Sequence, residues 1–382
     1  MRLSVPASAV VAAVVGFGGT LALILAAADA IGASPGEQAS LVAATCLAIA
    51  VETLFLSGWT RQPVVAAYST PGAALLAASA GYGMNEAVGA FLLTALALVL
   101  TGAFRPLTRL IARIPTSVAS GMLAGILLGF TLDAARTAPL DPVLILPLVL
   151  LFFAFRLLNP ALSVLAVLVG GVAGAILLDR LTGPLPPPQL SAVTLIGPEF
   201  SLSATLGLAV PIYLVTMASQ NLSGLAVLRA AGYDPPPGLL IGVTGLVSLV
   251  TAPFGALTTN LAAISAAICT GPDAHPDPRA RWMTGPFYAL TYALFALFGA
   301  SLVALFAALP QSLIVLVAGL ALLAPFTNAL VLALKDENER VAAVTALAVT
   351  ASGVSGFGVG AAFWGLMAGL GVIGLGRLKK RT

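Results

Sequence analysis

Apolar runs long enough to cross a lipid bilayer occupy almost the whole chain and restrict the folds that it can adopt. A membrane-spanning helix needs about 20 consecutive, mostly apolar residues. Such runs fall near residues 6–28, 38–57, 87–104, 116–132, 139–155, 160–178, 202–218, 238–251, 283–308, 311–333, 340–353 and 358–376. Charged residues make up 8% of the chain, whereas soluble domains carry about 25%. The sequence therefore predicts an all-α polytopic membrane protein.

Residues 63–79 are also apolar, but helix-breaking and polar residues interrupt them in the middle. Thr70 is a favourable helix N-cap. Pro71 suits the first helical position, because its missing N–H would have no partner there. We expect a short extended stretch that becomes a half-helix at Pro71, at about the depth of the bilayer centre.

Residues 252–270 repeat this pattern near the other end of the chain. Pro253 and Gly255 disfavour a regular helix, and Thr259 can cap a new one, so we expect the second half-helix to begin near Thr259. Aligning the two segments pairs Ser69 with Thr258, at an offset of 258 − 69 = 189 residues. This is close to half of the 382 residues, as expected for two repeats.

Paired interrupted segments in corresponding halves are typical of secondary transporters built from inverted repeats. Counted with the twelve uninterrupted runs they give 12 + 2 = 14 spans, seven on each side of a Pro-rich connection at 179–201. An odd number of spans in each half inverts the second half relative to the first. The two half-helices are then antiparallel, and their N-termini meet at the midplane from opposite sides.

The distribution of basic residues supports this topology. With the N-terminus in the cytoplasm, 15 of the 17 Lys and Arg residues fall on the inner side, among them a basic helix expected around Arg105, Arg109 and Arg113. Only Arg136 and Arg180 fall outside. The sequence thus predicts that the N- and C-termini are both cytoplasmic.

Two helix N-termini that meet at the midplane form an anion site without Lys or Arg, because each offers unpaired N–H groups and a positive dipole end. The candidate substrate-binding residues around it are Tyr68, Ser69, Thr70, Pro71, Gly72, Gln220, Asn221, Phe254, Leu257, Thr258, Thr259 and Asn260. Tyr68 and Phe254 precede the half-helices and are candidate walls for a flat ring. For the polar residues of the second interrupted segment, the alternative is backbone capping.

Gln220 and Asn221 are expected at the end of the first span of the second half. There they would bind the substrate, brace the broken segments, or simply end a helix at the membrane interface. Glu52 is an acid inside a span, which by default indicates function, most directly proton carriage. The alternatives for Glu52 are snorkelling or pairing with a neighbouring helix.

Cofactors and other function classes find little support in the sequence. One His and two Cys in separate apolar runs argue against a metal cluster, a haem site or a disulfide framework, so we expect no cofactor and no metal. No nucleophile–base pair supports an intramembrane enzyme, and we expect no nucleic-acid partner. A purely structural membrane protein would not explain the paired interruptions.

Several stretches together resemble the benzoate/proton symporter (BenE) family. They are Arg61-Gln-Pro-Val-Val, Ser69-Thr-Pro-Gly-Ala-Ala-Leu-Leu76, the run from Gln220 to Tyr233, Ala252-Pro-Phe-Gly255, Asn260-Leu-Ala-Ala-Ile264 and the run from Ala267 to Pro278. The resemblance covers essentially the whole chain. It implies a multi-pass carrier in the bacterial inner membrane, surrounded by lipid, that imports benzoate or a similar aromatic acid with protons, and it allows a homodimer.

That family in turn resembles the nucleobase/ascorbate and sulfate-permease type transporters, which have seven-plus-seven inverted repeats and an elevator mechanism. The resemblance implies strand-plus-half-helix segments at spans 3 and 10. It also implies a core domain, residues 1–104 and 201–308, and a gate domain, residues 105–200 and 309–382.

Two positions depart from the patterns of these families. The glutamates that bind the substrate in nucleobase carriers align near Gln220 and Thr259. Neutral residues at these positions suit an anionic substrate, because a carboxylate there would repel it. Many BenE members have His where this chain has Leu257. If that His couples protons, the role has moved elsewhere, with Glu52 as candidate. The alternative function is a carrier of another small anion or a nucleobase without proton coupling.

Overall fold

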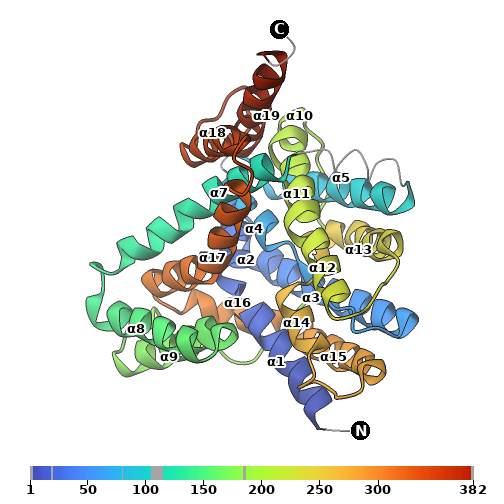
Figure 1. Ribbon diagram of the computed structural model, residues 1–382. Coiled ribbons are helices and arrows are strands. Elements are labelled where there is room, and N and C mark those ends of the chain that lie inside the picture. Colours follow the sequence, from blue (N-terminus) through green and yellow to red (C-terminus); the bar gives the residue numbers. More distant parts are fainter. Residues whose placement is uncertain (1–2, 19, 80, 105–114, 184–185, 380–382) are drawn as a thin grey trace.

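The computed structural model describes residues 3–18, 20–79, 81–104, 115–183 and 186–379, and it is mostly helical (Figure 1). The basic helix predicted around Arg105, Arg109 and Arg113 lies outside the described residues. Both broken segments are described in full, so the region that interrupts the helical pattern can be followed residue by residue.

Each of the twelve apolar runs coincides with a helix or a consecutive set of helices. In the first half these are α1 (Ser4–Gly18), α2 (Leu21–Ala30), α3 (Pro35–Thr60), α5 (Met84–Ala103), α7 (Thr116–Thr137), α8 (Pro142–Leu158), η1 (Pro160–Leu162) and α9 (Ser163–Leu177). In the second half they are α10 (Leu202–Ala204), η2 (Thr205–Ala209), α11 (Val210–Val215), η3 (Thr216–Asn221), α12 (Leu222–Ala230), α13 (Pro237–Thr251), η4 (Ala252–Phe254), η5 (Pro278–Met283), α15 (Thr284–Leu297), α16 (Gly299–Ala307), α17 (Gln311–Ala333), α18 (Arg340–Ala351) and α19 (Ala361–Lys379).

Seven helical stretches of the described chain are long and apolar enough to cross a membrane. The count is eight if the segments Pro278–Leu297 and Gly299–Ala307, which meet at a bend of 59°, form one span. Four shorter apolar helices, of 10–17 residues, are α8, α9, α18 and the part of α19 from Ala361 to Gly376. The chain is therefore a multi-pass helical membrane protein. The count of fourteen spans and the inverted repeat remain predictions.

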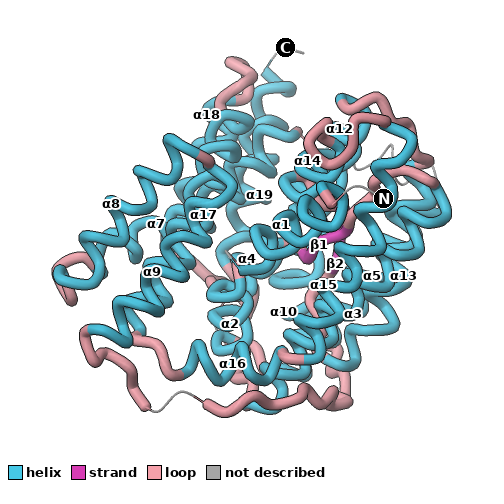
Figure 2. Tube along the Cα trace, turned by 90° about the horizontal axis from the view of Figure 1, so that it is seen from below, coloured by secondary structure: helices cyan, strands magenta, loops and turns pink. Residues whose placement is uncertain are grey.

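The two interrupted segments meet through a short antiparallel ladder. β1 (Ala66–Tyr68) leads into α4 (Thr70–Ala77), and β2 (Thr259–Leu261) precedes α14 (Ile264–Thr270). β1 and β2 pair with each other, and Figure 2 shows them in magenta. Extended backbone flanked by Pro and Gly thus forms where the helical pattern breaks.

The starts of the two half-helices differ from the sequence predictions. The N-cap of α4 is Ser69, whose Oγ accepts a hydrogen bond from the Gly72 N–H, so Thr70 is already helical. The prediction that a helix begins near Thr259 is wrong, because Thr259 lies in β2 and α14 begins at Ile264. Pairing with β1 holds the β-branched Thr259 in an extended conformation that suits it.

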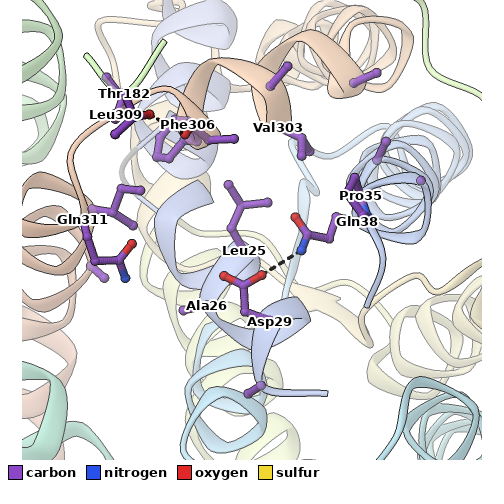
Figure 3. Close-up of a pocket in the computed structure, with 18 of the residues that line it drawn as sticks. Leu25, Ala26, Asp29, Pro35, Gln38, Thr182, Val303, Phe306, Leu309 and Gln311 are labelled. Carbon is purple, nitrogen blue, oxygen red and sulfur yellow. Dashed lines mark hydrogen bonds between the residues drawn. The ribbon is translucent and has the colours of Figure 1, made fainter. Parts of the chain in front are cut away.

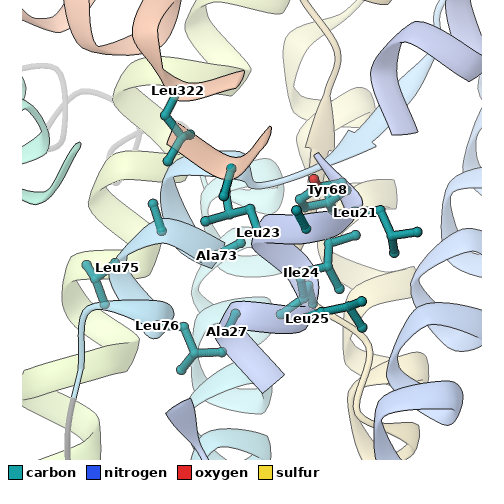
Figure 4. Close-up of a cluster of buried hydrophobic side chains, with 14 of the residues drawn as sticks. Leu21, Leu23, Ile24, Leu25, Ala27, Tyr68, Ala73, Leu75, Leu76 and Leu322 are labelled. Carbon is teal, nitrogen blue, oxygen red and sulfur yellow. The ribbon is translucent and has the colours of Figure 1, made fainter. Parts of the chain in front are cut away.

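The helices pack in two groups, and the ladder lies within one of them. α7 packs against α17 and α18, and α8 packs against α9; in the other group, α5 packs against α13 and α3 against α15. Figure 2 shows α7, α8, α9 and α17 on one side, and α3, α5, α13 and α15 with the two strands on the other. α2 lies between the groups, in contact with α4 and α17. Its buried side chains Leu23 and Leu25 share one cluster with Leu75, Leu76 and Leu322 (Figure 4).

Close helix contact depends on glycine at the crossing of α5 and α13. A Cβ added at Gly102 would lie 2.5 Å from the Cα of Gly242 and 2.7 Å from the carbonyl oxygen of Gly238. Neither neighbour is a flexible side chain, so the two backbones would have to separate.

We predict that Gly102→Ala destabilises the protein, because overpacking a tight contact costs about 1–3 kcal/mol. Thermal unfolding of the purified protein in detergent should show a clearly lowered midpoint. Gly58→Ala is the matched control, since a Cβ at Gly58 in α3 meets nothing within 4 Å. Equal midpoints for the two variants would contradict the close approach of α5 and α13.

Candidate functional site

The ladder between β1 and β2 fixes the geometry of the centre of the molecule. Its register places Ala66 opposite Leu261, Ala67 opposite Asn260 and Tyr68 opposite Thr259. The pairing continues on both sides. The Ser69 N–H donates to the Thr258 carbonyl at 2.8 Å, and the Ala262 N–H donates to the Val65 carbonyl at 3.0 Å. The backbones of the two segments are therefore hydrogen-bonded to each other from Val65 to Ser69, directly before α4.

One side of β2 presents polar groups without partners. Side chains alternate along an extended strand, so Thr258 and Asn260 share one face and Thr259 lies on the other. Thr258 is 3% exposed and Asn260 is fully buried. The hydroxyl of Thr258 and both amide atoms of Asn260 have no hydrogen-bond partner in the described part of the chain. Buried polar atoms are rarely left unpaired, because this costs about 1–3 kcal/mol, so these atoms mark a place for a ligand or water.

A small closed cavity lies beside Thr258 at the N-terminus of α4. Its lining residues are Ser69, Gly72, Ala73, Phe91, Ile212, Leu257 and Thr258. Its volume of about 10 Å³ is roughly that of one water probe, whereas ligand pockets usually measure about 300 Å³ or more. The site is therefore closed in this conformation.

A π-helical turn, η3, braces both broken segments from the middle of a long span. The Oγ1 of Thr216 lies 2.7 Å from the Oγ of Ser69, the N-cap of α4. The side-chain carbonyl of Asn221 accepts a hydrogen bond from the Leu261 N–H at 3.0 Å. π-helical turns inside α-helices are frequent at functional sites. Here the turn connects β2 with the start of α4.

The position of the two amides differs from the prediction. Gln220 and Asn221 do not lie at a helix end, because the helical stretch continues through α12 to Ala230. Of the three roles considered for Asn221, the structure shows the bracing one. Gln220 is half-buried on the same turn.

Two backbone groups predicted to hold an anion are already bonded. The Thr259 N–H donates to the Oγ of Ser248 at 3.0 Å, and the Leu261 N–H donates to Asn221. At α4, the Gly72 N–H donates to Ser69 over 3.2 Å. The first turn of α4 is nevertheless the better candidate for an anion, because only the Ser69 side chain, which can rotate away, holds the Gly72 N–H. Pro71 has no N–H, and the Ala73 N–H already donates to the Ser69 carbonyl at 2.8 Å.

The predicted aromatic walls lie away from the small cavity. Tyr68 is opposite Thr259 in the ladder, and its hydroxyl donates to the Thr20 carbonyl at 3.1 Å. Phe254 is half-buried in η4, where its carbonyl accepts a hydrogen bond from Ser40. The aromatic ring at the cavity belongs to Phe91 of α5, which sequence reasoning missed because it lies in an unbroken apolar run.

Glu52 of α3 contacts β2 directly. It is fully buried, and its Oε1 accepts a hydrogen bond from the hydroxyl of Thr259. Its Oε2 has no partner, and no ion pair to Glu52 occurs among the described residues. The same part of the chain contains no group of three or more His, Cys, Asp or Glu residues that could hold a metal ion.

Comparison with known proteins decides the family. The profile of the family described as "Benzoate membrane transport protein", BenE, matches residues 2–375. The chain belongs to the BenE family. This confirms the resemblance found in the sequence, and it makes the protein a member of a family of membrane transporters.

Two relatives agree with this assignment over nearly their whole lengths. The "Inner membrane protein YdcO" of Escherichia coli strain K12 is 41% identical over 365 residues, 94% of this chain and 92% of the relative. The "Benzoate membrane transport protein" of Acinetobacter baylyi is 34% identical over 370 residues, 96% of this chain and 94% of the relative.

The fold of this BenE-family chain is similar to a solved transporter structure. The transmembrane domain of the cyanobacterial bicarbonate transporter BicA superposes with a TM-score of 0.63 at 15% identity, covering 97% of this chain and 98% of that one. At this identity the likeness shows the fold alone.

A much larger cavity, of about 1240 Å³, lies between the two helix groups of the BenE-family fold (Figure 3). It is lined by α2, α3 and α16 on one side and by α7 and α17 on the other. Asp29 and Gln38 are hydrogen-bonded to each other at its wall, at 2.7 Å, and Gln311 faces them from α17. This cavity has room for a small organic molecule.

We predict that Asn221→Ala loosens β2, because it leaves the buried Leu261 N–H without its acceptor, at a cost of about 1–3 kcal/mol. Hydrogen–deuterium exchange of peptides covering residues 259–262 should become faster. Ser219→Ala is the control, because the Ser219 hydroxyl donates only within its own helix, to Val215. Unchanged exchange in Asn221→Ala would show that the brace does not hold the strand.

Proposed function

We propose that this protein is a proton-coupled symporter that imports benzoate or a similar aromatic carboxylate across the bacterial inner membrane. The observation that carries the proposal is the pair of unsatisfied, buried side chains on one face of β2: Thr258, which lines the cavity at the N-terminus of α4, and Asn260, two residues further along. The relative named "Benzoate membrane transport protein" supports the choice of substrate.

In this proposal the carboxylate binds at the first turn of α4, over Thr70 to Ala73. It displaces Ser69 from the Gly72 N–H, and the freed hydroxyl keeps Thr216 as its partner. Thr258 and Asn260 donate hydrogen bonds to the carboxylate, and Gln220 of η3 is a further candidate donor. Neutral donors and a helix N-terminus suit a monovalent anion, because they supply positive ends of dipoles without a fixed countercharge.

The aromatic ring then fits against apolar side chains that line the small cavity, Phe91, Ile212 and Leu257. An edge or offset contact with Phe91 adds to the burial of the ring. Because the cavity is closed, binding requires the surrounding helices to separate.

We propose fourteen spans, with the N- and C-termini in the cytoplasm. The eight candidate spans, the four shorter apolar helices and the two strand-plus-half-helix segments supply 8 + 4 + 2 = 14. The core domain then comprises residues 1–104 and 201–308, and the gate domain residues 105–200 and 309–382. The packing of α3 with α15 and of α7 with α17 supports this grouping.

We propose an elevator mechanism for this pair of domains. The large cavity lies at their boundary, lined by both groups, while the small cavity lies within reach of β1 and β2. A displacement of the core domain along the gate domain would expose the small site alternately to each side of the membrane.

Glu52 is the proposed proton carrier. An ionised Glu52 and a bound benzoate would repel each other across the low-dielectric core, because two like charges interact strongly where water is excluded. Protonation of Glu52 removes this repulsion, so proton and substrate bind together. Leu257 cannot carry a proton, and among the described residues Glu52 is the buried acid that contacts β2.

The alternative is a carrier of another small anion or of a nucleobase, without proton coupling. Neutral donors at a helix N-terminus do not by themselves select an aromatic carboxylate. Competition of labelled benzoate uptake by a panel of small anions and nucleobases separates these substrates.

The proposed function is tested by uptake of labelled benzoate into proteoliposomes that contain the purified protein. With an inward proton gradient we expect accumulation above equilibrium, and without the gradient only equilibration. Accumulation that ignores the gradient would contradict proton coupling. Absence of benzoate uptake would contradict the substrate assignment.

We predict that Asn260→Asp lowers benzoate uptake more than about tenfold, since an added repulsion of only about 1.4 kcal/mol has that effect. Initial uptake rates in proteoliposomes measure this. Asn338→Asp, in the exposed loop before α18, is the control and should transport normally. Normal uptake by Asn260→Asp would remove Asn260 from the binding site.

We predict that Glu52→Gln uncouples proton and substrate movement, because glutamine keeps the shape of the side chain but cannot take up a proton. A proton gradient should no longer drive accumulation in this variant. Glu337→Gln, an exposed acid at the other end of the sequence, serves as control. Gradient-driven accumulation by Glu52→Gln would contradict the assigned role.

A further inference from the structure

The hydroxyl of Thr259 lies at the centre of a buried hydrogen-bond network, of which the function proposed above uses only Glu52. Its Oγ1 contacts the Oε1 of Glu52, lies 2.7 Å from the Oγ of Ser248 and lies 3.3 Å from the carbonyl oxygen of Thr244. All four residues are buried, with Ser248 at 2% exposure and the others at 0%. The network joins α3, α13 and β2.

A count of protons restricts how this network can be arranged. The Ser248 Oγ accepts the Thr259 N–H at 3.0 Å, so its own hydroxyl proton is available for the Thr259 oxygen. Thr259 has a single hydroxyl proton, and it faces two acceptors, Glu52 and the Thr244 carbonyl. A threonine hydroxyl donates one hydrogen bond and accepts two, so only one of the two acceptors is served at a time.

We propose that Thr259 is a positioning residue that reverses its hydrogen bond when Glu52 gains a proton. With Glu52 ionised, the Thr259 hydroxyl donates to Oε1. With a proton on Oε1, Glu52 donates to the Thr259 oxygen, and the Thr259 hydroxyl turns to the Thr244 carbonyl. One proton is added on Oε1, and otherwise only hydrogen bonds are exchanged.

The reversal gives Glu52 a partner in both charge states without movement of α3. It also takes place in the strand that presents the candidate ligand groups, because Thr259 lies between Thr258 and Asn260. A change at Glu52 thereby reaches the proposed binding face through one residue of β2. The inference rests on the proposed role of Glu52 as proton carrier.

Several other titratable groups lie on or against α3. Those on the elements that pack against α3 are Asp29 of α2, Tyr68 of β1, Tyr288 and Tyr292 of α15, and Arg279 and Arg281 of η5; α3 itself carries Glu37 and Cys46. The hydroxyls of Tyr68 and Tyr288 donate to the carbonyls of Thr20 and Ala66, and Arg281 donates to three backbone carbonyls. No hydrogen bond from this set to Glu52 occurs among the described residues.

Infrared difference spectroscopy during a pH titration of the substrate-free protein tests the relay. A band from the protonated carboxyl C=O stretch that is lost in Glu52→Gln belongs to Glu52. Thr259→Val, which keeps the branched shape but lacks the hydroxyl, should shift this band to higher frequency and move its titration midpoint. Thr259→Ser, which restores a hydroxyl, should match the unaltered protein.

Thr251→Val is the matched control, because the Thr251 hydroxyl donates within α13 to Val247 and lies outside the network. A band and midpoint in Thr259→Val identical to those of the unaltered protein would overturn the relay, as would the absence of a Glu52 band. The infrared experiment contains no benzoate, so its result does not depend on transport. Failure of the uptake assay would count against the proposed function, whereas failure of the infrared test would count against the relay.

Discussion

The antiparallel ladder of β1 and β2 is the interaction on which the rest of the structure depends. Extended backbone inside a membrane exposes N–H and C=O groups that no water satisfies, so each must find a partner in the protein. The two interrupted segments supply partners to each other over Ala66–Tyr68 and Thr259–Leu261. Neither segment could remain extended there alone, which explains why both halves of the chain carry an interruption.

Hydroxyl and amide side chains from neighbouring helices complete the ladder at its outer edges. The Ala66 N–H donates to Thr53 of α3, and the Leu257 N–H donates to Thr45 of the same helix. On β2, Ser248 and Asn221 take the remaining N–H groups. These hydrogen bonds connect the two interrupted segments to α3, α13 and η3. The Thr258 hydroxyl and the Asn260 amide, which have no partners in the described part of the chain, lie on the face of β2 opposite to the Thr259 side chain, and a substrate there would bond to them.

Much of this architecture can be predicted from the sequence, and the predictions that are wrong have physical causes. Apolar length alone located the helices, and Pro and Gly located the breaks. The start of α14 was misplaced because Thr259 has two acceptable conformations, and only its pairing partner, distant in sequence, selects the extended one. Asn221 was placed at a helix end because polar residues usually mark one, whereas a π-helical turn carries it through the span.

The candidate site was only partly accessible from sequence for a related reason. Whether an N–H group is free depends on tertiary partners, so the bonded state of Thr259 and Leu261 could not be foreseen. Phe91 comes from an ordinary apolar helix, and no local signal distinguishes it. Thr258 and Asn260, in contrast, stand out in the sequence as polar residues in an apolar segment, and both have buried polar atoms without a hydrogen-bond partner in the described part of the chain.

In the proposed function, the substrate carboxylate binds beside the β1–β2 ladder, at the first turn of α4. A structure determined with 4-bromobenzoate bound, in which the bromine is located by its anomalous signal, tests this most directly. We predict the carboxylate within hydrogen-bond distance of the Thr258 hydroxyl and the Gly72 N–H, with the ring against Phe91. Bromobenzoate bound only in the large cavity near Asp29 and Gln38, with Thr258 and Asn260 still unpaired, would contradict the account.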